Sequence, residues 1–489
     1  MNGNRKKVFV IGLDCATPQL VFEKWQSDLP NIKRLIDGGV YGELESIIPP
    51  ITVPAWTCMM TSKDPGELGF YGFRNRKDYS YDGLSYANSL AIKDATLWDI
   101  LSKAGKKSIL VGVPQTYPPK PINGCMISCF LTPSTKSQYT FPPELKNEIE
   151  TVANSYMLDV EDFRTEDKKR VLDSIFEMTQ KRFQVVRHLI KTKEWDFFMM
   201  VEMGVDRIHH GFWKYFDKEH IKYEAGSPFE NAILEYYKYI DQEIGSILQL
   251  LDKDVTVLVV SDHGSQKMDG GICINEWLIR EGYLSLEEMP HTVTPLAKTK
   301  INWKKTIAWG EGGYYSRVSL NVKGREPQGI IEPEDYERVR NELKEKLGAL
   351  GDESGKPIGT KVYKPQEIYK KCNGIPPDLI VIFGNLLWRA VGSVGHGKIH
   401  TFENDTGPDD ANHSQYGIFV MSNLDGTGEK GLNLSSLHIM DIAPTILSLF
   451  GIETPNDMRG RIIRAESAVY STDEEEEVRK RLEALGYIE

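Results

Sequence analysis

Short apolar runs alternate along this chain with longer segments of helical periodicity, and this alternation constrains the fold more than any other feature. The apolar runs lie at residues 8–13, 108–113, 197–201, 255–260, 378–383 and 417–421. Continuous runs of this length, rich in Val, Ile and Phe, are typical of parallel strands buried on both faces. Apolar spacings of three and four predict helices at residues 96–104, 167–192, 228–251 and 333–347. We therefore predict an α/β fold with a central, mostly parallel sheet.

The 489 residues are enough for two or three average domains, but we expect one large body with insertions over residues 1–470. Two segments are predicted to be additions: a polar, proline-bearing stretch at about 132–167 and a lysine-rich stretch with one helix at about 284–372. Each either shapes the mouth of a pocket or is simple peripheral decoration. Residues 471–489 are expected to form a charged C-terminal helix.

Net charge narrows the classes of partner. The formal net charge of −11 disfavours a nucleic acid duplex or an anionic membrane as partner, because either would need a basic face. A small anionic substrate is compatible with this charge, since a bound metal ion can reverse the sign inside one cleft. At the N-terminus, Lys6 and Lys7 precede only the short apolar run 8–13, which enters an Asp rather than a cleavage site, so we expect no signal peptide. No stretch approaches the ~20 apolar residues of a membrane-spanning helix, so we expect no membrane association.

Cysteine usage indicates the compartment. The six cysteines form no CxxC pair and lie mostly inside apolar runs, which is typical of buried, reduced thiols in a cytoplasmic protein. These residues are Cys15, Cys58, Cys125, Cys129, Cys273 and Cys372.

Two candidate site residues lie where a predicted strand ends or a predicted helix begins. Asp14 ends the run VFVIGLD, and open α/β sheets present ligands at the carboxyl ends of strands, although a lone Asp there is more often a turn or a cap. Thr52 stands in PPITVPAWTCMMTS, ahead of a helical pattern. It is either a structural N-cap or an oxygen nucleophile that faces the free N–H groups of a helix N-terminus.

Two further motifs combine carboxylate and imidazole groups. In FFMMVEMGVDRIHHGFW, Asp206 and His210 are four residues apart, so on a helix they face one side and can hold one ion, whereas His209 would point elsewhere. The apolar strand VTVLVVSDHGSQ ends in the adjacent pair Asp262 and His263, which can bind a second ion or fix one ion from two sides.

A late histidine completes the set, because His413 precedes another apolar strand in DDANHSQYGIFVM. The order of an Asp after the first strand, P-x-x-T-x-P-x-W, D-x-x-x-H, S-D-H-G and a late His before G-I-F resembles the type I phosphodiesterase/nucleotide pyrophosphatase branch of the alkaline phosphatase superfamily. More closely, it resembles the prokaryotic members described as predicted phosphohydrolases or phosphomutases. The resemblance runs from residue 8 to about 461 and includes GREPQG at 324–329, PPDLIV at 376–381, NDTGPDDANH at 404–413 and DIAPTIL at 441–447.

The resemblance implies an alkaline phosphatase-like three-layer sandwich and a two-metal phosphoester hydrolase, either a phosphodiesterase or a phosphatase. Its substrate would be a small phosphorylated molecule, and Thr52 would be the nucleophile that carries a phosphothreonine intermediate. The two ions would be Zn²⁺ or a similar divalent metal, with Mn²⁺ as the alternative. The implied ligands fall into two sets: Asp206, His210 and His413 for one ion, and Asp14, Asp262, His263 and Thr52 for the other.

One departure from the family pattern bears on the substrate. Nucleotide pyrophosphatases of this family commonly carry an Asn three residues after the nucleophile, where this chain has Ala55. Transition-state charge would then depend more on metal ions and backbone N–H groups. This weakens the case for a nucleotide pyrophosphate as substrate and leaves phosphoester hydrolysis intact.

Three alternatives compete with this hypothesis. A metal-dependent phosphomutase of the same fold needs a large domain after its nucleophile, and the stretch from Thr52 to Asp206 is too short for that domain and the core. A sulfatase needs Cys or Ser in a C/S-x-P-x-R setting, which neither Cys15 nor Cys58 has. A non-catalytic metal-binding or scaffold protein that has kept the fold is disfavoured by the intact set of ligands, because buried, unpaired carboxylates and imidazoles are costly without an ion.

Other polar and aromatic residues lie near these motifs in sequence, and each can either line a pocket or pack structurally. Structural packing is the favoured interpretation for each of them. They are His209, Trp213, Lys267, Asn275, His396 and His400.

Overall fold

A ten-stranded sheet is the main feature of the computed structural model, which describes residues 6–464 and 477–482. The strand order is β20-β2-β19-β9-β1-β8-β5-β6-β7, and β21 pairs with β2. The strands are β1 (Lys7–Leu13), β2 (Gly39–Glu45), β5 (Ser108–Val111), β6 (Gly124–Ile127), β7 (Thr140–Phe141), β8 (Phe197–Glu202), β9 (Val255–Val260), β19 (Tyr416–Asn423), β20 (Leu432–Asn433) and β21 (Leu437–His438). Strands β9, β1, β8, β5 and β6 are parallel, whereas β19 is antiparallel to both of its neighbours. The predicted mostly parallel sheet is confirmed.

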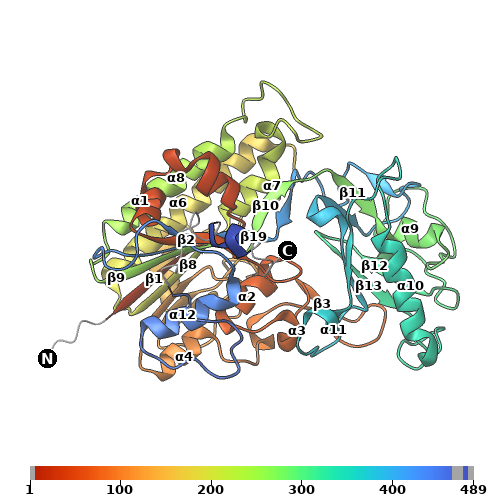
Figure 1. Ribbon diagram of the computed structural model, residues 1–489, viewed down its shortest axis with the longest axis horizontal. Coiled ribbons are helices and arrows are strands. Elements are labelled where there is room, and N and C mark those ends of the chain that lie inside the picture. Colours follow the sequence, from red (N-terminus) through yellow and green to blue (C-terminus); the bar gives the residue numbers. More distant parts are fainter. Residues whose placement is uncertain (1–5, 465–476, 483–489) are drawn as a thin grey trace.

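Helices cover both faces of this sheet (Figure 1). On one side lie α1 (Pro30–Asp37), α6 (Lys168–Thr192), α7 (Gly204–Phe216) and α8 (Ala232–Leu248). On the other side lie α2 (Thr52–Thr61), α4 (Leu97–Lys103) and α12 (Ile442–Leu449). The three-layer α/β sandwich is therefore confirmed, and the predicted helix at 167–192 begins one residue later because Asp167 is its N-cap and accepts from the Arg170 N–H.

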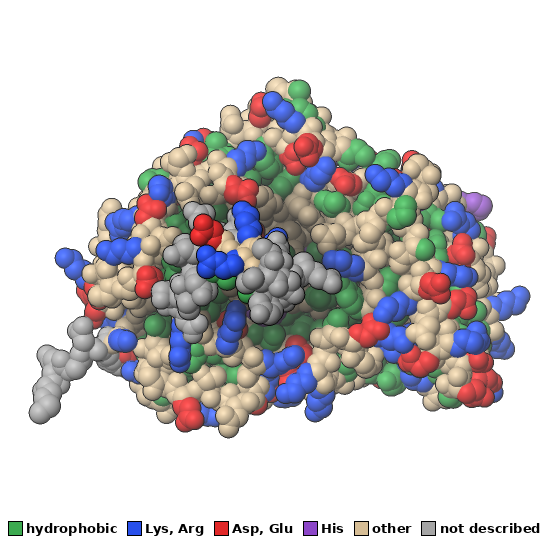
Figure 2. All heavy atoms as spheres, viewed as in Figure 1, with side chains coloured by type: hydrophobic (Ala, Val, Ile, Leu, Met, Phe, Trp, Pro, Cys, Tyr) green, Lys and Arg blue, Asp and Glu red, His purple; other side chains and the backbone are tan. Residues whose placement is uncertain are grey.

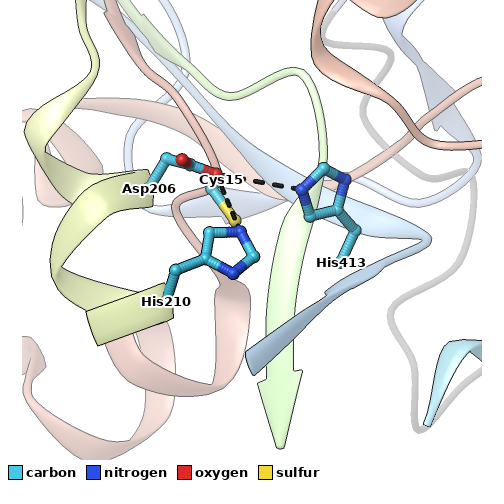
Figure 3. A group of neighbouring side chains, drawn as sticks. All are labelled: Cys15, Asp206, His210 and His413. Carbon is cyan, nitrogen blue, oxygen red and sulfur yellow. Dashed lines mark ion pairs between the residues drawn. The ribbon is translucent and has the colours of Figure 1, made fainter. Parts of the chain in front are cut away.

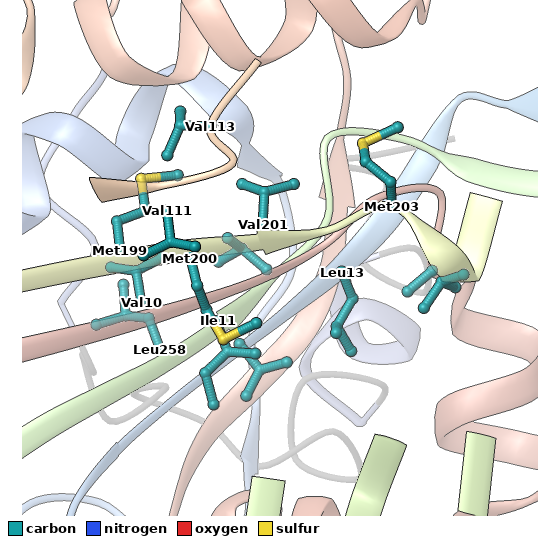
Figure 4. Packing of buried hydrophobic residues seen from close by; sticks show 14 of the residues in the cluster. Val10, Ile11, Leu13, Val111, Val113, Met199, Met200, Val201, Met203 and Leu258 are labelled. Atoms are coloured by element: carbon teal, nitrogen blue, oxygen red, sulfur yellow. The ribbon is translucent and has the colours of Figure 1, made fainter. Parts of the chain in front are cut away.

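The core lies between the sheet and these two helical layers. Figure 4 shows Val10 and Ile11 of β1 packed beside Met199 and Met200 of β8, with Leu258 of β9 near by. All of these side chains are fully buried. Because both faces of each strand are covered, consecutive residues are all apolar, which is the pattern that predicted these strands.

A second lobe packs beside the sandwich and has its own hydrophobic cluster, whose members run from Ile272 to Ile399 (Figure 1). These limits are wider than the insertion expected at 284–372. The lobe holds β11 (Gly270–Cys273), α9 (Ile274–Arg280), β12 (Ala308–Glu311), β13 (Ser316–Leu320), α10 (Tyr336–Gly348), β14 (Lys361–Tyr363), β15 (Leu379–Ile382), β16 (Trp388–Val391) and β17 (His400–Thr401).

The run at 378–383 was expected in the central sheet, and this expectation was wrong. It forms β15, which lies between β13 and β14 in an antiparallel four-stranded sheet of the second lobe. All four residues of β15 are buried, so its apolar pattern is the same as that of a central parallel strand. Burial on both faces sets this pattern, and it does not encode which sheet the strand joins.

A two-stranded antiparallel ribbon carries the chain out to the second lobe and back. Strand β10 (Gly264–Lys267) leaves the sandwich, and β18 (Ala411–Ser414) returns beside it with Ser265 opposite His413. The ribbon brings His413 next to His263, and the centroids of the two imidazole rings are 3.8 Å apart. Two residues that are 150 positions apart in the sequence are thus placed side by side.

The remaining segments lie at the periphery. The stretch at 132–167 contributes the edge strand β7 and helix α5 (Leu145–Ala153), and its Arg164 reaches the second lobe, where it donates to the Tyr314 hydroxyl at 2.8 Å. Of the expected C-terminal helix, residues 477–482 are helical and the remainder lies outside the described residues. Within the described part of the chain, no helix has the length and apolar character needed to span a membrane.

Candidate active site

The candidate site lies at the carboxyl edge of three neighbouring strands, β9, β1 and β8. Asp14 follows β1, Asp262 and His263 follow β9 after Ser261, and helix α7, which carries Asp206, begins just after β8. Open α/β sheets bind ligands at this edge, because the loops that leave parallel strands converge there. The sequence motifs therefore meet in space for a topological reason.

Asp206, His210 and His413 form the first group. The Asp206 Oδ1 atom lies 3.2 Å from the Nε2 atom of His210, one helical turn further along α7, and 3.8 Å from the Nε2 atom of His413. Figure 3 shows these side chains directed at one another, with the thiol of Cys15 among them. One ligand atom from each of the four residues lies within 4.8 Å of all the others. Cys15 was not predicted here, because a single cysteine beside an acidic residue carries no motif.

Asp14, Asp262 and His263 form the second group, and their ligand atoms also lie within 4.8 Å of one another. The Asp14 Oδ2 atom accepts from the Trp56 indole N–H at 2.7 Å, and Asp262 Oδ2 lies 3.2 Å from His263 Nε2. The Thr52 Oγ1 atom is 3.3 Å from the same imidazole nitrogen. All seven predicted residues are thus brought into two adjacent buried groups.

Thr52 is the first residue of α2, and the N-cap position is occupied by Ile51. The structural interpretation of Thr52 as an N-cap therefore does not apply, and its hydroxyl points toward His263 instead. Thr52 is buried, with 4% of the residue exposed. At this position the hydroxyl is close to the free N–H groups and the positive dipole end of the helix, which favour an anion.

Each of the three histidines is oriented by a hydrogen bond that its Nδ1 atom donates. Nδ1 donates to the Gly264 carbonyl at 3.1 Å in His263, to the Pro50 carbonyl at 2.8 Å in His413, and to Asp409 Oδ1 at 2.6 Å in His210. Because carbonyl and carboxylate oxygens accept, Nδ1 is the donor in each pair and the Nε2 atoms are left facing the two groups. This arrangement orients the three imidazole rings for metal binding.

Three buried polar atoms of the site have no hydrogen-bond partner among the described residues, and they are Asp14 Oδ1, Asp262 Oδ2 and His413 Nε2. Leaving such atoms unpaired in a dry interior is costly. Burial, followed by the repulsion of Asp206, raises the pKa of Asp14 well above its usual range. Burial, followed by Asp14, does the same to the pKa of Asp262. A divalent cation would satisfy both the open atoms and the excess of negative charge, so the residues fit a metal site.

Asp409 is a residue of the site that was not predicted. Burial would raise its pKa, but His210, Arg164 and Arg389 outweigh burial and hold the pKa well below the usual range. Asp409 Oδ2 accepts from Arg389 at 2.5 Å and from Arg164 at 3.1 Å. This places a fixed anion behind His210. Its only signal in the sequence was its place in the NDTGPDDANH segment.

The other residues named near the motifs lie outside the two groups. His209 packs in the core against Trp213 and Tyr237, and the distance from its Nε2 atom to the Tyr237 hydroxyl is 3.2 Å. In the second lobe, Asn275 donates to two backbone carbonyls and His400 contacts the Gly351 carbonyl. His396 contacts Ser393, and Lys267 pairs with Asp269.

A cavity of about 830 Å³ lies in the second lobe, and none of the residues of the two groups lines it. Its lining combines aromatic and aliphatic side chains with arginines and acids, and it includes residues of the hairpin β3 (Arg74–Arg76) and β4 (Leu84–Tyr86). Tyr81 and Trp303 are stacked with ring centroids 3.5 Å apart, and Trp309 packs against both. Arg389 lines this cavity and also pairs with Asp409 behind His210. Figure 2 shows the surface hollowed between the two lobes, with acidic and basic side chains interspersed on that face.

The fold is alkaline phosphatase-like and is shared with solved ectonucleotide pyrophosphatases/phosphodiesterases. Human ectonucleotide pyrophosphatase/phosphodiesterase 5 (ENPP5) aligns with a TM-score of 0.54 and 14% identity, covering 93% of this chain and 97% of its own. An inactive variant of murine ENPP5 in complex with AMP aligns with a TM-score of 0.53 and 12% identity, covering 92% of this chain and 97% of its own. At such identities the likeness shows the fold alone.

The sequence itself identifies the family. A family model described as Type I phosphodiesterase / nucleotide pyrophosphatase matches residues 8–409, so the chain belongs to this family of phosphoester hydrolases. A search of curated protein sequences finds no significant match. The matched range contains Thr52 and every predicted ligand except His413, which follows it closely.

Proposed function

We propose that the chain is a two-metal phosphoester hydrolase that uses Thr52 as its nucleophile. The observation that carries this proposal is the convergence of seven predicted residues on one buried place, where three of their ligand atoms have no hydrogen-bond partner among the described residues. Membership of the phosphodiesterase/pyrophosphatase family supports the reaction class.

The two groups divide into two ion sites in this proposal. Asp206, His210 and His413 would hold one divalent ion, and Asp14, Asp262, His263 and the Thr52 oxygen would hold the other. Imidazole and carboxylate ligands suit Zn²⁺, with Mn²⁺ as the alternative. When bound, the ions would favour the ionised Thr52 hydroxyl and neutralise charge on the phosphoryl oxygens.

The residues of the chain would carry out an in-line displacement in two steps. In the first step Thr52 Oγ1 forms a bond to phosphorus, the ester bond to the leaving alcohol breaks, and the alcohol departs with a proton. In the second step water cleaves the phosphothreonine and restores the Thr52 hydroxyl, with phosphate or a phosphomonoester as product. Backbone N–H groups in the first turn of α2 would bind a phosphoryl oxygen, a role that the Ala55 methyl group cannot take.

The organic part of a small phosphorylated substrate would lie in the neighbouring cavity. A volume of about 830 Å³ is typical of pockets for small molecules, and the lining offers both aromatic side chains and arginines. The solved AMP complex of murine ENPP5 suggests a nucleotide-like group as one candidate, and Ala55 argues against a pyrophosphate. A phosphomutase remains the second enzymatic hypothesis, and no contact of the described residues favours it.

The experiment is a hydrolysis screen together with metal analysis of the purified protein. Bis-p-nitrophenyl phosphate reports diesterase activity and p-nitrophenyl phosphate reports monoesterase activity. We expect two divalent ions per chain and turnover of at least one of these esters, with turnover lost after chelation and restored by Zn²⁺ or Mn²⁺. Absence of bound metal together with absence of turnover on both esters would contradict the proposal.

A further inference from the structure

Cys15 occupies a place in the candidate site that the proposed ligand sets do not use. It follows Asp14 directly and is fully buried. Its Sγ atom lies within 4.8 Å of a ligand atom on each of Asp206, His210 and His413 (Figure 3). Thiolate sulfur is a strong ligand for Zn²⁺ and a weak one for Mg²⁺ and Mn²⁺, so its presence there has chemical consequences.

A second, independent observation indicates that these four residues surround a ligand. The Nε2 atom of His413 is buried and aimed into the group, yet it has no hydrogen-bond partner among the described residues. The separations from Asp206 Oδ1 to the two imidazole nitrogens, 3.2 and 3.8 Å, bracket the roughly 3.3 to 3.6 Å expected between ligand atoms on one tetrahedral Zn²⁺ ion.

We infer that Cys15 Sγ is a fourth protein ligand of the ion held by Asp206, His210 and His413. The two metal sites are then chemically unequal, because the first has one sulfur, two nitrogens and one oxygen, whereas the second has three oxygens and one nitrogen. The first site would select Zn²⁺, and the second would accept Mn²⁺ as well. This inference rests on the metal binding of the proposed function and does not depend on turnover.

The competing interpretation is that the thiol only fills space below the site. Cys15 Sγ does contact the Gly264 carbonyl at 3.3 Å, a geometry that suits a weak S–H donor. That carbonyl already accepts from His263 Nδ1 at 3.1 Å, so it does not depend on the thiol. Packing also fails to explain a non-glycine residue at φ 68°, a backbone conformation that favours glycine. Glycine is therefore a well-tolerated replacement, and Cys15→Gly removes the sulfur without straining the backbone.

The first test uses Co²⁺ as a spectroscopic substitute in the metal-stripped full-length protein. A thiolate ligand gives Co²⁺ an intense charge-transfer absorption in the near ultraviolet, whereas nitrogen and oxygen ligands do not. We expect this band in the wild type and in Cys58→Ser, a matched control whose thiol is buried in α2 outside the group. The band should be absent in Cys15→Ser and Cys15→Gly.

The outcomes separate the inference from the proposed function. Binding of two Co²⁺ ions to the wild type without the band would overturn the role of Cys15 and leave the two-metal proposal standing. A band that persists in Cys15→Ser would do the same. Failure of the wild type to bind Co²⁺ would overturn the metal sites themselves, and the role of Cys15 with them.

The second test compares metal exchange by elemental analysis. After the Zn²⁺-loaded protein is dialysed against excess Mn²⁺, the wild type should retain about one Zn²⁺ per chain, and Cys15→Gly should exchange both ions. Loss of a residue that only supports a metal ligand typically weakens metal binding by about tenfold or more. Loss of a direct ligand should cost at least as much, so we expect the variant to bind Zn²⁺ at this site at least about tenfold more weakly. Equal exchange by the two proteins would contradict the inference. The melting temperature without metal checks that the variant folds.

Discussion

At the scale of single residues, Asp409 illustrates how a side chain outside the ligand sets controls one of them. Its carboxylate accepts from His210 Nδ1 at 2.6 Å and is held in turn by Arg389. Asp409→Asn keeps the shape but removes the anion, so we expect metal affinity to fall by about 10- to 100-fold. Competition with a chelator of known affinity measures the change. Asp405→Asn is the control. Asp405 lies in the same segment as Asp409, but it accepts from Ser393 and does not contact His210.

His209 makes a different prediction, which concerns stability. Burial lowers the pKa of His209 to about 3, from an ordinary value of 6.5, so the folded protein holds this imidazole neutral. Below pH 6.5 the unfolded chain binds a proton there that the folded chain does not. The free energy of unfolding therefore decreases as the pH is lowered from 6.5 to 3. His209→Gln removes this contribution. Chemical denaturation at several pH values should therefore show a shallower loss of stability in the variant, and parallel curves would contradict the assignment.

At the scale of elements, the β10–β18 ribbon determines the position of His413. A Cβ atom on Gly264 would lie 2.2 Å from the Tyr416 carbonyl oxygen and 2.4 Å from Ser414 Oγ, so β18 would have to move. We expect Gly264→Ala to lower stability by about 1–3 kcal/mol and to weaken metal binding through His413. Thermal unfolding and metal analysis measure these two effects. Gly348→Ala in α10, where a Cβ meets open space, should leave both unchanged.

Elements also show how far the sequence alone could predict the structure. The helix at 167–192 and the strands that end in Asp14 and Asp262 follow from periodicity, because burial on one stripe or on both faces leaves a local pattern. The sheet to which β15 belongs does not follow, since its residues are buried on both faces in either place. Cys15 and Asp409 were missed for a related reason: each acts through residues far away in the sequence, and no local spacing marks them.

At the scale of the whole molecule, the second lobe adds the wall of the cavity to a site built by the sandwich. The cavity wall and the site share Arg389, which links the aromatic lining to Asp409. If the organic part of the substrate lies there, Trp309→Ala should raise KM about tenfold for an ester with a bulky aromatic or aliphatic group, by loss of ~1.5 kcal/mol of apolar contact. A methyl ester of the same phosphate should be unaffected. Steady-state kinetics on the two esters tests this placement, and an equal change for both would contradict it.

The most direct test of the central claim is the rate of ester hydrolysis by the wild type and by Thr52→Ala, measured on samples of known metal content. The account predicts that the variant loses turnover while it keeps its fold and binds metal through the other six predicted ligands, because only the attacking oxygen is removed. Thr57→Ala, at a buried threonine one turn further along α2, should retain activity. Undiminished turnover by Thr52→Ala would contradict the account.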